Sequence, residues 1–103
     1  MHSSSVTSEE YCDYEHFDVS CHSGLMLQIL QAQYGHMSLG KCVTRDLGIF
    51  GCQTDVLHIL SNHCGRQNQC SIAVDDEKLR NTQPCDRGIL VYLNADHACL
   101  KGK

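Results

Sequence analysis

The chain has 103 residues with eight cysteines, and its formal net charge at pH 7 is -4. Eight lysines and arginines against twelve acidic residues leave no basic footprint for nucleic acid, so nucleic acid is excluded as an expected partner. Apolar runs are no longer than a strand, so no insertion into a membrane is predicted.

The first ten residues are polar and rich in serine, which predicts a flexible N-terminal tail over residues 1–10. The opening Met-His-Ser-Ser-Ser lacks the apolar core of a signal peptide. We therefore expect either that a signal was removed or that these residues belong to an expression tag. Residues 16–21 then alternate, with Phe17 and Val19 on one face, as in a half-buried strand. Residues 25–30 are ambiguous by periodicity, but their short length between turn residues favours a second strand.

One main helix is predicted in the middle of the chain. Residues 35–53 contain four glycines and predict a long loop that disulfides would have to order. Over residues 54–64 the apolar side chains recur on one helical face. Thr54 is suited to cap this helix, and Gly65 to end it in a left-handed conformation.

The remaining segments predict short strands. Residues 71–74 form an apolar strand-sized run, residues 75–81 a polar excursion, and residues 88–93 a strongly apolar strand that Cys99 closes. Several short strands with one helix indicate an α+β domain.

The cysteines favour disulfides over metal. Structural zinc sites use pairs spaced Cys-x2-4-Cys, whereas the closest pair here, Cys64 and Cys70, has five residues between its members. Four bridges are the simple interpretation of an even count in so short a chain, although spacing alone leaves about 105 pairings open. Disulfides require an oxidising compartment, so we expect the protein to be secreted or on the extracellular face of the cell surface.

A set of sequence landmarks lies between the cysteines. They are Cys12 followed by acidic residues and Cys21, the segment Ala32-Gln33-Tyr34-Gly35-His36, the pair Cys64-x5-Cys70, the segment Gln83-Pro84-Cys85, and finally Gly88 and Tyr92-Leu93. Together they resemble the galactose-binding or rhamnose-binding lectin domain first described in sea urchin egg lectin and also found at the N-terminus of latrophilin receptors. That family has Ala-Asn-Tyr-Gly-Arg, Asp-Pro-Cys and Gly-Thr-Tyr-Lys-Tyr-Leu where this chain has its second, fourth and last landmarks.

The resemblance implies a fold and a cysteine pairing. The implied pairs are Cys12–Cys42, Cys21–Cys99, Cys52–Cys85 and Cys64–Cys70. The expected fold is a small disulfide-rich α+β domain over residues 11–100, followed by a short tail at 101–103. Its short antiparallel strands would lie in a sandwich-like arrangement, with one main helix at about 54–64 and long loops.

The resemblance also implies a carbohydrate site, at Asp13, Gln33, Tyr34, His36, Gln83 and Gly88. Two of these positions depart from the family in charge. His36 replaces an arginine, a permanently charged fork of five donors, and Gln83 replaces an aspartate, a charged two-oxygen acceptor.

Structural interpretations of the same residues stay open. Tyr34 either packs beneath the loops or stacks on a sugar, and Asp13 either binds or is simply solvated. His36 is either a ligand or a surface histidine. The Gln83-Pro84-Cys85 segment needs no ligand, because proline before a bridged cysteine is ordinary loop chemistry.

These observations predict an extracellular, lectin-like carbohydrate-binding module whose specificity differs from that of simple rhamnose or galactose binders. The alternative is a protein-binding adhesion or receptor module on the same fold. An enzyme is not predicted, because the sequence has no nucleophile motif and no paired carboxylates in a recognisable frame.

The expected partner is a glycan, related to galactose or rhamnose or larger, or an extracellular protein. A homodimer would supply avidity to a single site of modest affinity. No cofactor is expected: the resemblance implies calcium-independent binding, and residues 75–77 do not form an EF-hand-like loop.

Overall fold

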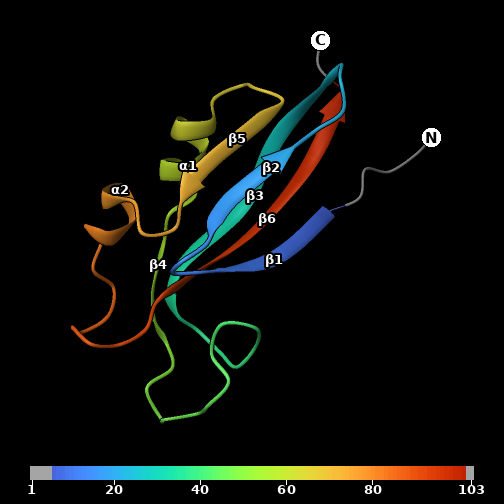
Figure 1. Ribbon diagram of the computed structural model, residues 1–103. Helices are drawn as coiled ribbons and strands as arrows, with labels where there is room; N and C mark the ends of the chain where they lie inside the picture. Colours follow the sequence, from blue (N-terminus) through green and yellow to red (C-terminus); the bar gives the residue numbers. More distant parts are fainter. Residues whose placement is uncertain (1–5, 102–103) are drawn as a thin grey trace.

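The computed structural model describes residues 6–101. Its strands are β1 (Val6–Cys12), β2 (His16–Ser20), β3 (Leu25–His36), β4 (Cys52–Asp55), β5 (Gln69–Ala73) and β6 (Tyr92–Lys101), and its helices are α1 (Leu57–Cys64) and α2 (Glu77–Arg80). A four-stranded antiparallel sheet has the order β1-β6-β3-β4, and β2 pairs with β5 in a second sheet. The small sheet lies over one face of the large one, with α1 beside it (Figure 1). This is the disulfide-rich, mainly antiparallel fold that was predicted.

The core lies between the two sheets and α1. Phe17 and Val19 are buried while their neighbours in β2 are exposed, which confirms the alternation seen in the sequence. They share one apolar cluster with Leu27 and Ile29 of β3 and Leu60 of α1. Burial of these side chains joins the two sheets into a single unit.

All eight cysteines pair as the resemblance implied. The bridges are Cys12–Cys42, Cys21–Cys99, Cys52–Cys85 and Cys64–Cys70, at sequence separations of 30, 78, 33 and 6. The longest links the end of β2 to the last strand, and two others anchor long loops to the large sheet. No cysteine is free, so a disulfide-linked dimer is not expected.

Two sequence predictions need correction at strands. Residues 6–10, expected to be part of a flexible tail, form most of β1, because β6 offers them a complete antiparallel partner from Val6 to Cys12. The rest of that tail, residues 1–5, lies outside the described residues, as do residues 102 and 103. The strand expected at 88–93 begins only at Tyr92 and continues to Lys101, whereas residues 88–91 belong to a loop.

The helices also differ from the prediction. Thr54 belongs to β4, so α1 begins later, at Leu57, whose backbone N–H donates to Asp55 Oδ1 at 2.8 Å. Gly65 ends α1 with a φ of 62°, a conformation that glycine adopts without a Cβ clash. The polar excursion contains the short helix α2, which Asp76 caps by accepting from the backbone of Lys78.

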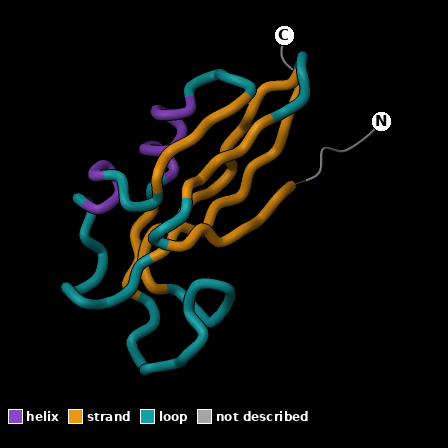
Figure 2. The backbone as a smooth tube through the Cα atoms, viewed as in Figure 1, coloured by secondary structure: helices purple, strands orange, loops and turns teal. Residues whose placement is uncertain are grey.

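Two long connections lie at the same end of the large sheet, away from the chain termini (Figure 2). One spans residues 37–51, between β3 and β4; the other spans residues 81–91, between α2 and β6, and is called the 81–91 loop below. The 81–91 loop contains Gln83 and Gly88, two of the positions that the resemblance links to binding. Within the described residues, neither helix is long and apolar enough to cross a membrane.

A histidine of β6 is buried beside Phe17 of the core. His97 of β6 is 9 % exposed, its ring lies 6.3 Å from that of Phe17, and its Nδ1 has no hydrogen-bond partner among residues 6–101. Burial lowers the pKa of His97, and the negative charges of Glu9 and Asp96 oppose that shift without cancelling it. The neutral imidazole is therefore the form that the folded protein favours.

We expect acid to destabilise the domain through His97. Because its folded pKa lies below its unfolded value, the unfolded chain binds the proton first as the pH falls through about 6.5. The free energy of unfolding should then decrease toward pH 5, and His97→Gln should flatten this decrease. Urea denaturation at several pH values measures the slope, with the exposed His58→Gln as control. A wild-type slope retained in His97→Gln would assign the acid sensitivity to other groups.

Candidate functional site

A cavity of about 520 Å³ lies between β3, the end of α2 and the 81–91 loop. Tyr34 comes from β3, Arg80 from the last turn of α2, and Gln83 and Gly88 from the loop itself. Its volume is within the range of pockets that hold small molecules. Both termini of the 81–91 loop are fixed, by α2 and by β6, and Cys85 is also bridged to Cys52.

Tyr34 is the most deeply placed of these side chains. It pairs in register with Thr54 of β4 and Leu93 of β6, and it is only 1 % exposed. Its hydroxyl has no hydrogen-bond partner among residues 6–101. Burial raises the pKa of Tyr34, although the positive charge of Arg80 opposes the rise. A buried hydroxyl without a partner costs free energy, so this group is poised to bond to a molecule that enters beside it.

Gln83 has an unusual backbone for its residue type. Its φ is 41°, in the left-handed region that residues other than glycine, asparagine and aspartate rarely adopt. In this conformation the backbone N–H of Gln83 donates to the carbonyl of Arg80 at 3.1 Å. Such strain costs on the order of 1 kcal/mol, and it often occurs where a loop is shaped for binding.

Asp13 and Arg80 form an ion pair at the rim of the cavity. Arg80 Nη2 donates to both carboxylate oxygens of Asp13, at 2.9 and 3.0 Å, and Arg80 Nε donates to the carbonyl of Asp75 at 3.3 Å. Asp13 does not line the cavity itself, but it orients a side chain that does. Arg80 was not predicted as a site residue, because nothing in the polar run 75–81 distinguishes one charge from another. Its partner is 67 residues away.

The cavity does not include the other two predicted residues. Gln33 precedes Tyr34 in β3 and therefore points to the opposite face of the sheet, where its Oε1 accepts from Gln53 Nε2 at 3.3 Å. His36 is 3 % exposed, stacks on Phe50 at 5.1 Å, and donates from Nδ1 to the carbonyl of Leu90 at 2.6 Å.

The loop expected over residues 35–53 begins later than predicted, because Gly35 and His36 still belong to β3. Gln33 to His36 all lie within β3, because β4 pairs with all four residues and β6 with the first three. Of the predicted site residues, the structure brings Tyr34, Gln83 and Gly88 together around the cavity.

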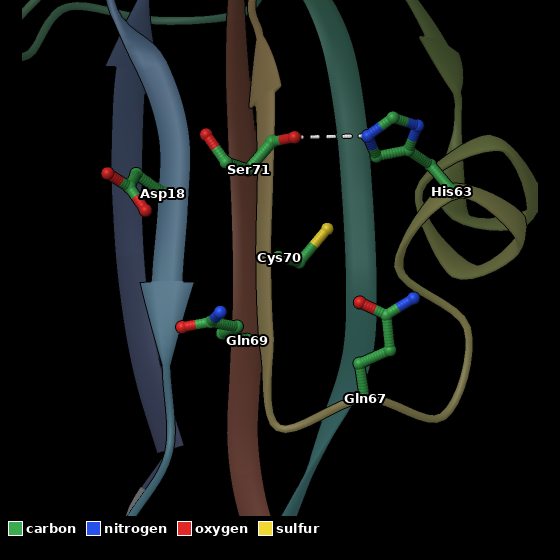
Figure 3. A pocket seen from close by; sticks show the side chains of 6 residues that line it. All are labelled: Asp18, His63, Gln67, Gln69, Cys70 and Ser71. Atoms are coloured by element: carbon green, nitrogen blue, oxygen red, sulfur yellow. Dashed lines mark hydrogen bonds between the residues drawn. The ribbon is translucent and has the colours of Figure 1, made fainter.

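A second hollow, of about 360 Å³, lies where α1 ends against β5 (Figure 3). Its polar groups do not converge: Figure 3 shows Asp18 and His63 on opposite sides of β5. His63 Nε2 is already engaged, since it donates to the carbonyl of Ser71 at 3.0 Å. The hollow also contains none of the predicted site residues, so the cavity of the 81–91 loop is the better candidate.

Among residues 6–101, one group of side chains has the composition of a metal site. Cys12, Glu15 and Cys42 place ligand atoms close together, but the two sulfurs form a disulfide and offer no thiolate. Glu15 is occupied as well: it accepts from the backbone of Cys12 and pairs with Lys41 at 2.9 Å, and both contacts lower its pKa. This cluster is therefore a structural junction.

A family model described as the D-galactoside/L-rhamnose binding SUEL lectin domain matches residues 19–99. The chain belongs to the SUEL lectin family. No curated protein gives a significant match. The family consists of non-catalytic binding modules, and the matched region includes the whole lining of the cavity but begins after Asp13. The SUEL lectin match thus suggests a carbohydrate-binding module.

Proposed function

We propose that this SUEL lectin domain is an extracellular module that binds carbohydrate in the cavity of the 81–91 loop. The observation that carries the proposal is the unpartnered hydroxyl of Tyr34 in the wall of that cavity, in a chain whose family is described as sugar-binding. Sugars are recognised by fixed donors and acceptors, and Tyr34 offers a hydroxyl that no protein group occupies among residues 6–101. The four disulfides fit an oxidising, extracellular location.

We further propose that the specificity differs from that of simple galactose or rhamnose binders. His36 does not line the cavity. Its ring is stacked on Phe50 and hydrogen-bonded to the carbonyl of Leu90. Gln83 offers an uncharged amide where the family has a carboxylate, and hydrogen bonds to charged groups are the stronger kind. Recognition therefore has to depend on other groups.

A glycan array with the folded domain tests the proposal. We expect saturable binding of at least one oligosaccharide that is inhibited by the same sugar in solution and unchanged by EDTA. Calorimetry with free galactose and rhamnose should show weak or no binding. Tight binding of either monosaccharide would contradict the altered specificity, and a silent array would contradict carbohydrate binding altogether.

Tyr34→Phe is expected to separate binding from stability. The substitution removes only the buried, unpartnered hydroxyl, so the free energy of unfolding should stay equal or rise by up to about 1 kcal/mol. If the hydroxyl bonds to the glycan, loss of one neutral hydrogen bond should weaken binding about fivefold. Thermal unfolding and a titration with the array ligand measure the two effects. Unchanged affinity would leave Tyr34 a purely structural side chain.

The alternative, a protein-binding module, is favoured by one observation. The 37–51 loop exposes Leu39, Leu47 and Ile49, by 53, 66 and 37 %, at the same end of the molecule as the cavity. Exposed apolar side chains of this kind are common at protein interfaces. If no glycan on the array binds, a protein-binding module becomes the better explanation.

A further inference from the structure

We infer that Arg80, a residue of the short helix α2, supplies the charged donors with which the cavity recognises a neutral glycan. This inference rests on the proposed carbohydrate binding and extends it to a recognition residue and a class of sugar. Arg80 has a fixed orientation, unused donors and a place in the cavity wall.

The guanidinium of Arg80 is held from two directions. Nη2 donates to both carboxylate oxygens of Asp13, and Nε donates to the carbonyl of Asp75. The two N–H groups of Nη1 make no hydrogen bond to any residue in 6–101, so they remain available. A planar fork that is already oriented loses little conformational entropy when it binds.

Stability does not account for this arrangement. The side chain of Arg80 is 50 % exposed and that of Asp13 is 29 % exposed, and an ion pair so open to solvent adds little to the free energy of folding. Arg80 nevertheless lines the cavity whose wall also contains Tyr34. Arg87, the other cation of that wall, is exposed and makes no side-chain hydrogen bond to the described residues. Arg80 is therefore the cation with a defined position.

The pairing with Asp13 indicates which sugars fit. The carboxylate compensates the charge of Arg80, so the pair as a whole does not favour an anion. Nη1 of Arg80 offers two N–H donors, which match hydroxyl oxygens that accept. The ligand class is accordingly a neutral glycan, rather than one with a carboxylate or sulfate.

The test compares four proteins on the same glycan array and then by titration with the best ligand: wild type, Arg80→Gln, Arg80→Lys and the control Arg66→Gln. Arg66 is exposed and lies near the end of α1, where it lines a different hollow, so it controls for the loss of one positive charge. We expect neutral glycans among the wild-type ligands. Both Arg80 variants should bind about tenfold to a hundredfold more weakly, as expected for a lost hydrogen bond from a charged donor. Arg66→Gln should match wild type, and all four should unfold at similar temperatures.

The outcomes separate the two proposals. Wild-type protein that binds no glycan would overturn the proposed function and this inference with it. Wild-type binding that Arg80→Gln retains would overturn the role of Arg80 and leave the function standing. Full affinity in Arg80→Lys would show that the planar fork is not used. Ligands that are all acidic glycans would overturn the assignment of the sugar class.

Discussion

Replacement of Cys21 and Cys99 together by alanine is expected to lower the free energy of unfolding by about 4 to 5 kcal/mol. Replacement of Cys64 and Cys70 should lower it by only about 2 kcal/mol. Both values are the contribution of chain entropy in the unfolded state. The bridges span 78 and 6 residues. A longer closed loop removes more conformations from the unfolded chain, so its bridge stabilises the native state more. Domains of this size are typically stable by only 5 to 15 kcal/mol, so loss of the long bridge should leave a marginal fold.

Packing is expected to reduce the difference between the two losses of stability. Cys64 and Cys70 are buried, so their replacement also leaves small cavities, whereas Cys21 and Cys99 are only partly buried. Urea denaturation of the two double variants measures both losses. Equal losses, or a larger loss for the short bridge, would show that local packing outweighs the chain entropy of the unfolded state.

Strands were predicted correctly where the local sequence pattern and the pairing with a distant strand both favour the same structure. The alternation of Phe17 and Val19 predicted β2, since a half-buried strand needs only one apolar face. Where pairing decides the structure, local pattern failed. The polar residues 6–10 have no strand signal of their own, and they become a strand because β6 presents an unpaired edge to them.

The site was predicted only in part, for a similar reason. Tyr34, Gln83 and Gly88 were found by resemblance, which preserves positions along the chain. Arg80 was not found, because its orientation depends on Asp13 across the fold and on a helix too short to show periodicity. A charged side chain in a polar run gives no sign of whether it faces solvent or a cavity.

Gly35, the neighbour of Tyr34 in β3, pairs with the strand that is bridged to the 81–91 loop. Gly35 pairs directly with Gln53, and Cys52, the residue before it, is bridged to Cys85 of the 81–91 loop. The position of β4 therefore fixes both the sheet edge beside Tyr34 and one wall of the cavity. A close approach of two backbones explains why glycine occupies this place in β3.

Gly35→Ala is expected to cost at least about 3 kcal/mol of unfolding free energy and to abolish glycan binding, because overpacking against atoms that cannot turn aside lies at the upper end of such effects. The new Cβ would lie 2.6 Å from the Cα of Gln53 and closer still to the carbonyl oxygen of Cys52. Both are backbone atoms, so β4 itself would have to move, and the bridge would transmit that movement to the 81–91 loop. Gly24→Ala is the matched control: its φ of 87° makes alanine strained by about 1 to 2 kcal/mol, but its Cβ would meet no atom within 4 Å and the cavity is distant. Thermal unfolding and glycan titration of both variants decide the matter. If Gly35→Ala is no less stable than Gly24→Ala and still binds, then β4 can yield at this point, and the cavity does not depend on its position.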